Sequence, residues 1–162
     1  MTPLTILFVE DNEDLQAFVS EVLKDKYEII RAEDGEEGWE MMLESIPDLI
    51  VSDIMMSKMD GIQFCEKIKS DIRTSHIPVI LLTAKSTTAS LLEGLESGAD
   101  LYLTKPINMD VLELNIKNLL NSRAIMQQKY SQQIFGSNKL IHTNRGKEDQ
   151  FLNTITRFVE DN

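Results

Sequence analysis

Short apolar runs recur along this chain, and a stretch with helical spacing separates each run from the next. Four of these runs cover residues 5–9, 49–52, 78–82 and 101–104. Such alternation is typical of parallel strands joined by crossover helices, and it predicts an α/β sheet covered on both faces. The pattern alone does not predict the order of the strands in the sheet.

Residues that favour helix starts and turns stand between these runs. Asp34 and Gly35 predict a turn before a helix over residues 36–44, another strand is expected over residues 27–32, and Gly98 predicts a left-handed helix end. Helix caps are expected at Asp11 or Asn12, Asp60, Thr87 or Thr88, and Asn108. The stripes expected to face the core are Leu15, Phe18, Val19 and Val22 in the first helix, Leu91, Leu92 and Leu95 in the fourth, and Val111, Leu112, Ile116, Leu119 and Leu120 in the fifth.

The four runs named above each stop at residues suited to phosphate chemistry. Glu10 and Asp11 follow the first run, and the others stop at Asp53, Thr83 and Lys105. Because open parallel sheets bind ligands at the carboxyl ends of their strands, these side chains are expected to converge on one rim. Three carboxylates, one hydroxyl and one ammonium fit a site for a divalent cation and a phosphoryl group.

Asp53 is the candidate nucleophile, because a carboxylate can attack a phosphoryl group and form an acyl phosphate. Glu10 and Asp11 would repel it unless a cation lies between them, and Mg²⁺ is the expected cation. Lys105 and Thr83 would stabilise the phosphoryl oxygens. Simpler interpretations stay open for each residue: a cap or turn for Asp53, a solvated helical turn for Glu10 and Asp11, and an ordinary surface role for Thr83 and Lys105.

The composition narrows the class of protein. The 162 residues carry a net charge of -11, which argues against non-specific binding of nucleic acid and against adhesion to an anionic membrane. The lone Cys65 excludes an internal disulfide and suits a reducing compartment. No apolar run approaches the roughly 20 residues that span a bilayer, and the N-terminus lacks a signal-peptide pattern. We expect a cytoplasmic segment without membrane contact of its own, within a parent that could be anchored in the inner membrane.

The character of the sequence changes after Arg123. A glutamine-rich, helix-compatible stretch is followed at residues 136–146 by a segment that is typical of a linker. Residues 148–160 are again amphipathic, and nothing later in the chain covers their apolar face. Either this last helix packs back on the first domain, or the chain has three parts: a first domain over residues 1–123, a helical extension and linker over 124–147, and the first helix of a truncated second domain over 148–162.

Four motifs occur together in the first part: Ile6-Leu7-Phe8-Val9-Glu10-Asp11-Asn12, Asp53-Ile54-Met55-Met56 with Met59-Asp60-Gly61, Leu82-Thr83-Ala84, and Gly98-Ala99-Asp100-Leu101-Tyr102-Leu103-Thr104-Lys105-Pro106. Through these motifs residues 4–122 resemble a receiver domain of the two-component response-regulator family. The resemblance implies a flavodoxin-like, doubly wound sheet of five parallel strands in the order 2-1-3-4-5, with five helices. It also implies a cis peptide bond between Lys105 and Pro106.

The resemblance further implies a chemistry for the rim residues. Asp53 would accept a phosphoryl group from a histidine of a kinase. Glu10, Asp11 and Asp53 would hold Mg²⁺ together with the backbone carbonyl of Met55. The chain would not be an enzyme beyond its own Mg²⁺-dependent phosphorylation and dephosphorylation.

The family also suggests a switch. Thr83 would move toward the phosphoryl group, Lys105 would bind that group's oxygens together with Thr83, and Tyr102 would fill the space that Thr83 leaves. The switching face comprises the fourth helix, the fifth strand and the fifth helix, and two copies could pair through it. A half-buried aromatic on a strand is the simpler interpretation of Tyr102.

Two positions depart from the family pattern, Ser57 and Leu101, and a third, Met55, allows a kinetic prediction. Ser57 stands where the family usually has proline, which leaves the conformation of that loop open. Leu101 stands where a polar residue is common, so Leu91, Leu95 and Leu101 form either an apolar patch on the switching face or part of the core. Met55 cannot orient a water molecule by hydrogen bonding, which predicts slow loss of the phosphoryl group.

Two other functions compete with a receiver. A phosphatase of the haloacid-dehalogenase type also uses an aspartate at a strand end, but it needs a second aspartate where this chain has Met55. A nucleotide-binding module needs a glycine-rich loop after the first strand, where this chain has Glu10-Asp11-Asn12-Glu13-Asp14.

The last residues carry a second resemblance. Glu148-Asp149-Gln150-Phe151-Leu152 and Phe158-Val159-Glu160-Asp161-Asn162 resemble the opening helix of AraC-type helix-turn-helix domains. A receiver followed by such a domain is similar to the C-terminal part of hybrid two-component proteins, with a free-standing response regulator as the alternative. DNA would then be bound only through the missing part of that domain, and the output would be regulation of transcription.

Overall fold

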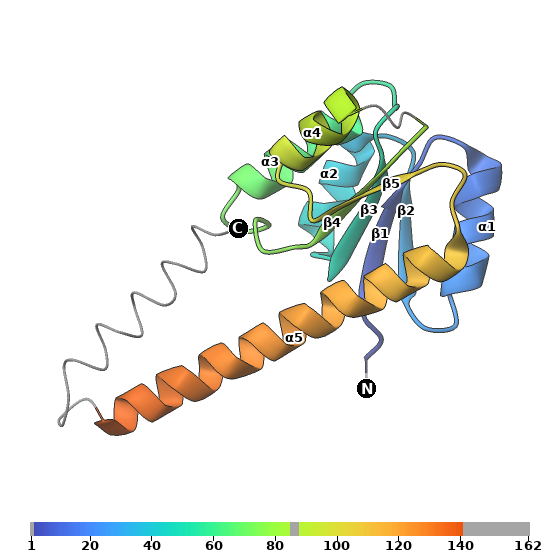
Figure 1. Ribbon diagram of the computed structural model, residues 1–162. Coiled ribbons are helices and arrows are strands. Elements are labelled where there is room, and N and C mark those ends of the chain that lie inside the picture. The colour runs from blue at the N-terminus through green and yellow to red at the C-terminus, as the bar shows by residue number, and fades with distance from the viewer. Residues whose placement is uncertain (1, 85–87, 141–162) are drawn as a thin grey trace. The chain divides into compact units, whose positions relative to one another are not determined.

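The computed structural model describes residues 2–84 and 88–140 (Figure 1). Its elements are β1 (Thr5–Val9), α1 (Glu13–Leu23), β2 (Glu28–Ala32), α2 (Gly35–Glu44), β3 (Leu49–Asp53), α3 (Gly61–Ser70), β4 (Val79–Thr83), α4 (Thr88–Glu96), β5 (Leu101–Thr104) and α5 (Met109–Leu140). The strands pair in parallel in the order β2-β1-β3-β4-β5, which confirms the predicted flavodoxin-like sheet. The chain divides into two units, Met1–Leu120 and Asn121–Asn162, and the sheet belongs to the first.

Alternating side chains of the strands build a core on each face of the sheet. Ile6 and Phe8 of β1 pack with buried residues of α1 and α5, whereas Leu7 and Val9 pack with α2 and α3. Figure 1 shows this division, with α1 and α5 on one face of the sheet and α2 and α3 on the other. The central strands β3 and β4 are buried along their whole length, because helices exclude water from both of their faces.

Most of the predicted helix ends are confirmed. The side chain of Asn12 accepts a hydrogen bond from the backbone N–H of Leu15 at 3.0 Å, and Asp60 forms a capping box with Gln63. The side chain of Asn108 accepts from the N–H of Asp110 at 3.0 Å. Gly98 has a φ of 95°, as its predicted left-handed conformation requires, and the bond between Lys105 and Pro106 is cis.

The predicted core face of α1 is confirmed at Val19 and wrong at Phe18. The residues of α1 that are buried are Gln16, Val19, Ser20 and Leu23, whereas Phe18 is 54% exposed. The buried set has the i, i+3, i+4, i+7 spacing of a helical stripe, but two of its members are polar. A prediction based on apolar residues alone therefore chose a neighbouring face.

The other apolar stripes are corrected in part. In α4, Leu91, Leu92 and Leu95 are 39%, 53% and 45% exposed, because this helix offers its small residue Gly94 to the sheet instead. In α5, Leu112, Ile116 and Leu120 are buried as predicted, whereas Val111 is 42% exposed.

Several boundaries also shift. The predicted turn at Asp34 is the N-cap of α2, because its side chain accepts from the N–H of Glu37 at 2.9 Å. β2 and β4 each begin one residue later than expected, at Glu28 and Val79. α5 continues to Leu140 and so includes the first residues of the predicted linker. The capping position at Thr87, the rest of the linker and the predicted helix over residues 148–160 lie outside the described residues.

No helix within residues 2–84 and 88–140 has the length and the apolar character that a membrane crossing requires.

Candidate functional site

Three acidic side chains meet where β1 and β3 end. Glu10 follows β1, Asp53 is the last residue of β3, and these two strands are neighbours in the sheet. One carboxylate oxygen from each of Glu10, Asp11 and Asp53 lies within 4.8 Å of the other two. Glu10 and Asp53 are only 1% and 4% exposed, whereas Asp11 is exposed to solvent. The structure therefore brings together the carboxylates that the sequence places at separate strand ends.

Lys105 supplies the positive charge beside these acids. Its Nζ lies 3.2 Å from each carboxylate oxygen of Glu10 and 3.2 Å from Oδ2 of Asp53. The backbone N–H of Lys105 donates to the carbonyl of Thr83 at 2.7 Å, which fixes the start of the loop after β5. Three carboxylates and one ammonium leave an excess of negative charge when all are ionised.

Burial and the neighbouring charges together shift the pKa values of two groups. Burial first, and then repulsion by Asp53, raises the pKa of Glu10 to about 7, although Lys105 acts in the opposite direction. Burial by itself would lower the pKa of Lys105, but attraction by Asp53 and Glu10 outweighs it and raises that pKa above its ordinary value. The buried Glu10 carboxylate therefore gains from a cation bound beside it.

The donor set fits Mg²⁺. This ion takes oxygen ligands, keeps several waters and is commonly held by one or two carboxylates together with phosphate oxygens. Glu10 and Asp53 offer buried carboxylate oxygens, and exposed Asp11 leaves one side of the site open to water. This pattern of oxygen ligands without nitrogen or sulfur argues for a hard cation.

The two predicted switch residues occupy the neighbouring strands. Thr83 ends β4, is 1% exposed and is in register with Thr104 of β5. Tyr102 of β5 is half-buried and packs against the core beside α4. A Cβ atom added to Gly94 of α4 would lie 2.5 Å from Cδ2 of Tyr102, so the glycine leaves room for the ring.

The loop after Asp53 is held from both ends despite the absence of proline at Ser57. The N–H of Gly61 donates to the carbonyl of Ile54 at 2.9 Å, and the N–H of Gly35 donates to that of Met59 at 3.2 Å. Lys58 adopts a φ of 64° within this loop. Met55 is 57% exposed at the start of the same loop.

Sequence reasoning missed Gln16. This residue of α1 is 9% exposed, and its Nε2 donates to the carbonyls of Glu10 at 3.2 Å and Ala32 at 3.0 Å. The helical spacing of Gln16 with Val19, Ser20 and Leu23 could have indicated this position, if polar residues had been allowed in the predicted core stripe.

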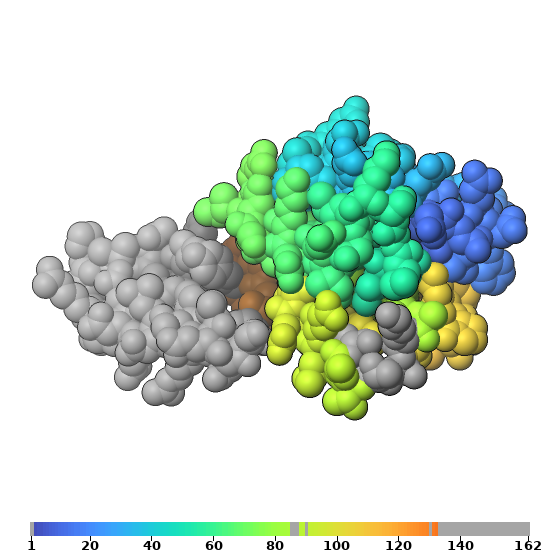
Figure 2. Space-filling view, turned by 90° about the horizontal axis from the view of Figure 1, so that it is seen from above, coloured from blue at the N-terminus to red at the C-terminus, as the bar shows by residue number. Residues whose placement is uncertain are grey.

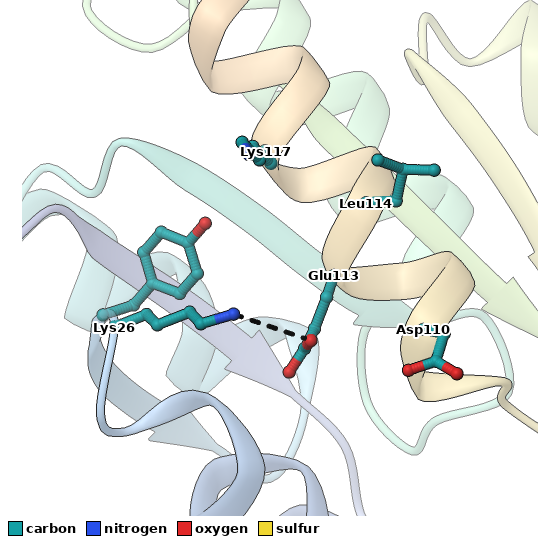
Figure 3. Close-up of a pocket in the computed structure, with 6 residues that line it drawn as sticks. Lys26, Asp110, Glu113, Leu114 and Lys117 are labelled. Atoms are coloured by element: carbon teal, nitrogen blue, oxygen red, sulfur yellow. Dashed lines mark ion pairs between the residues drawn. The ribbon is translucent and has the colours of Figure 1, made fainter.

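A hollow lies between the turn after α1 and helix α5 (Figure 3). Lys26 reaches toward Glu113 there, with their charged atoms 3.9 Å apart. Figure 2 shows α1 (blue) next to the start of α5 (amber) on the same side of the sheet domain, in agreement with their shared core. The hollow shares no residue with the acidic site, since its lining consists of Lys26, Tyr27, Asp110, Glu113, Leu114 and Lys117.

A doubly wound parallel sheet with a carboxylate cluster and a lysine at its strand ends defines a class of proteins that handle phosphoryl groups. The family model for the response regulator receiver domain matches residues 6–117 of this chain. The chain therefore belongs to the response-regulator receiver family, and this part of it is a receiver domain of two-component signalling.

Individual relatives agree with this assignment. The chain is 42% identical over 158 residues to histidine kinase P4 of Formosa agariphila, a match that covers 98% of this chain and 12% of that protein. It is 35% identical over 120 residues to response regulator Rre1 of Synechocystis, covering 73% of this chain and 52% of that protein. The chain thus spans about an eighth of one curated relative and about half of the other.

Solved structures share the fold. The signal receiver domain of a signal transduction histidine kinase from Syntrophus aciditrophicus has a TM-score of 0.69 and 35% identity, over 73% of this chain and 90% of that one. The receiver domain of the Francisella response regulator 1452 has a TM-score of 0.69 and 30% identity, over 74% of this chain and 98% of that one.

Proposed function

We propose that Asp53 takes a phosphoryl group from a phosphorylated histidine of a kinase. A carboxylate oxygen of Asp53 attacks phosphorus, the bond from phosphorus to the imidazole nitrogen breaks, and its electron pair returns to the ring. The observation that carries this proposal is the convergence of Asp53 with Glu10, Asp11 and Lys105 at the strand ends.

The neighbouring residues have distinct parts in this proposal. Glu10, Asp11, Asp53 and the backbone carbonyl of Met55 would hold Mg²⁺, which when bound neutralises charge on the phosphoryl oxygens. The ammonium of Lys105 and the hydroxyl of Thr83 would bind these oxygens. The hydrolysis of the acyl phosphate is the only other reaction that the proposal assigns to the chain itself.

Intact-mass spectrometry after treatment with acetyl phosphate and Mg²⁺ tests the acceptor. The wild type is expected to gain one phosphoryl group, whereas Asp53→Asn, which keeps the shape of the side chain, is expected to gain none. Glu13→Gln is the matched control, because Glu13 is an exposed acid of the first turn of α1 outside the cluster.

Two results would contradict the acceptor role. Equal labelling of Asp53→Asn and wild type would place the phosphoryl group elsewhere. Repeated turnover of a generic phosphate ester would instead support the phosphatase alternative, because a receiver is labelled once per molecule.

We further propose that phosphorylation shifts Thr83 and Tyr102 and thereby changes the surface of α4, β5 and α5. Leu91, Leu92 and Leu95 of α4 are exposed on this surface and favour pairing of two copies. Light scattering with beryllofluoride as a phosphoryl mimic tests this pairing. The expected dimer should disappear in Leu95→Glu, and a monomer in the presence of the mimic at high protein concentration would count against it.

The parent protein is expected to be a hybrid histidine kinase whose output is transcriptional. The match to histidine kinase P4 supports this, because it extends over 158 residues and so beyond the receiver domain. An antibody against this 18.5 kDa segment should detect a membrane-associated protein several times larger in the source cells, with this domain on the cytoplasmic side. A band of about twice the segment's mass would instead indicate a free-standing regulator.

A further inference from the structure

Gln16 is a polar residue on the core-facing stripe of a helix, where apolar side chains are the rule. It occupies the core-facing stripe of α1 with Val19 and Leu23 and is 9% exposed. A buried amide is costly unless its polar atoms are hydrogen-bonded. An apolar residue would fill this position without that requirement, which suggests that the hydrogen bonds of Gln16 have a role beyond core packing.

Both N–H groups of the Gln16 amide have partners at the acidic site. Nε2 donates to the carbonyl of Glu10 at 3.2 Å and to the carbonyl of Ala32, the last residue of β2, at 3.0 Å. The backbone N–H of Glu10 donates to the same carbonyl of Ala32 at 3.0 Å. One side chain from α1 thus ties the end of β1 to the end of β2.

The hydrogen bond to the carbonyl of Glu10 holds the backbone just beyond the last paired residues of β1 and β2. The ladder between β1 and β2 ends at Val9 and Ala32, and the chain then leaves the sheet for α1. The carbonyl oxygen of Glu10 belongs to the peptide group that joins Glu10 to Asp11. Because a peptide group is planar, holding this oxygen restrains the orientation of the peptide plane that joins the two acidic residues.

This restraint matters because the acids repel one another. Their oxygens lie within 4.8 Å, and the repulsion favours any backbone movement that separates them. We propose that Gln16 is a positioning residue, which keeps Glu10 and Asp11 in the geometry that a divalent cation needs without touching the cation itself. The inference rests on the proposed function, since it assigns a metal to this cluster.

Isothermal titration of the unphosphorylated protein with Mg²⁺ tests the inference. Gln16→Met keeps the length of the side chain but removes both donors, and it should weaken Mg²⁺ binding by about tenfold, as is usual when a residue that orients a metal ligand is lost. Val19→Ala is the matched control, because it loosens the core packing of the same helix one turn from Gln16 and leaves both hydrogen-bond donors of Gln16 in place.

The outcomes separate this inference from the proposed function. If the wild type binds no Mg²⁺ at millimolar concentration, the metal site itself is refuted. If the wild type binds and Gln16→Met binds within twofold of it, the positioning role alone is refuted. If Val19→Ala weakens binding as much as Gln16→Met, the effect is one of general stability and the positioning role is again refuted. Tenfold weaker binding in Gln16→Met with an unchanged Val19→Ala supports it.

Discussion

Lowering the pH should release Mg²⁺ from this domain well above the usual titration range of a carboxyl group. The pKa of Glu10 is raised to about 7 by burial and by Asp53, so a proton competes with the cation for the same oxygens near neutral pH. With an ordinary glutamate, protons would compete with the cation only near a pH of about 4.

The size of the effect follows from the fraction of ionised Glu10. With a pKa of about 7, that fraction is roughly 90% at pH 8, roughly 10% at pH 6 and roughly 1% at pH 5. The apparent affinity for Mg²⁺ should therefore fall about tenfold from pH 8 to pH 6 and about a further tenfold from pH 6 to pH 5.

The stability of the metal-free protein should change in the opposite direction. A carboxyl group whose pKa is higher in the folded than in the unfolded state favours folding when it is protonated. Between pH 4.5 and about 7 the unfolded chain loses the Glu10 proton while the folded state still holds it, so the free energy of unfolding should fall by about 3 kcal/mol as the pH rises through this range. Mg²⁺ should restore stability above this range, because it binds the folded state.

Isothermal titration at pH 8, 7 and 6, paired with urea unfolding without metal, measures both effects. Glu10→Gln is the control, because it cannot titrate: it should bind more weakly than wild type at pH 8 and change less than twofold down to pH 6. A wild-type affinity that stays constant within twofold over this range would refute the reasoning from burial and repulsion.

Three further results are expected. Met55→Asn should shorten the lifetime of the acyl phosphate at least about tenfold in a pulse-chase experiment, because it supplies a hydrogen-bonding group that can orient water. An unchanged lifetime would show that Met55 does not limit hydrolysis. Lys105→Met should tighten Mg²⁺ binding by about tenfold, or about 1.4 kcal/mol, because it removes a competing positive charge 3.2 Å from the two buried acids. Weaker binding of the variant in titration calorimetry would contradict this. Gly94→Ala should lower the free energy of unfolding by about 1–2 kcal/mol, because the new methyl would lie 2.5 Å from the ring of Tyr102. NMR spectra should show this ring displaced from α4. A stable variant with the ring in its original place would contradict the prediction.

The candidate site was largely predictable from sequence because parallel strands end at a common edge. Each run of apolar residues shows where its own strand stops: Asp53 is the last residue of β3, and Glu10 and Lys105 directly follow β1 and β5. Once the strands are parallel, their carboxyl ends meet at one edge. The fold was predictable for a related reason, since buried parallel strands need uninterrupted apolar runs whatever their order.

Other features were decided only by packing. Spacing could not choose between the face of α1 that contains Phe18 and the one that contains Gln16 and Ser20. The structure buries the more polar face, where the glutamine reaches the carbonyls of Glu10 and Ala32 at the ends of β1 and β2. Such bonds join residues from three separate elements, and no local pattern of hydrophobicity encodes them.

The sequence by itself thus determined the α/β class, the places where the strands end and the residues that stand there. The tertiary structure decided the rotation of α1, the exposure of the α4 leucines and the raised pKa values of Glu10 and Lys105. The physical reason is range: strand ends are set by neighbouring residues, whereas helix rotation and pKa depend on the burial and charges that distant segments bring together.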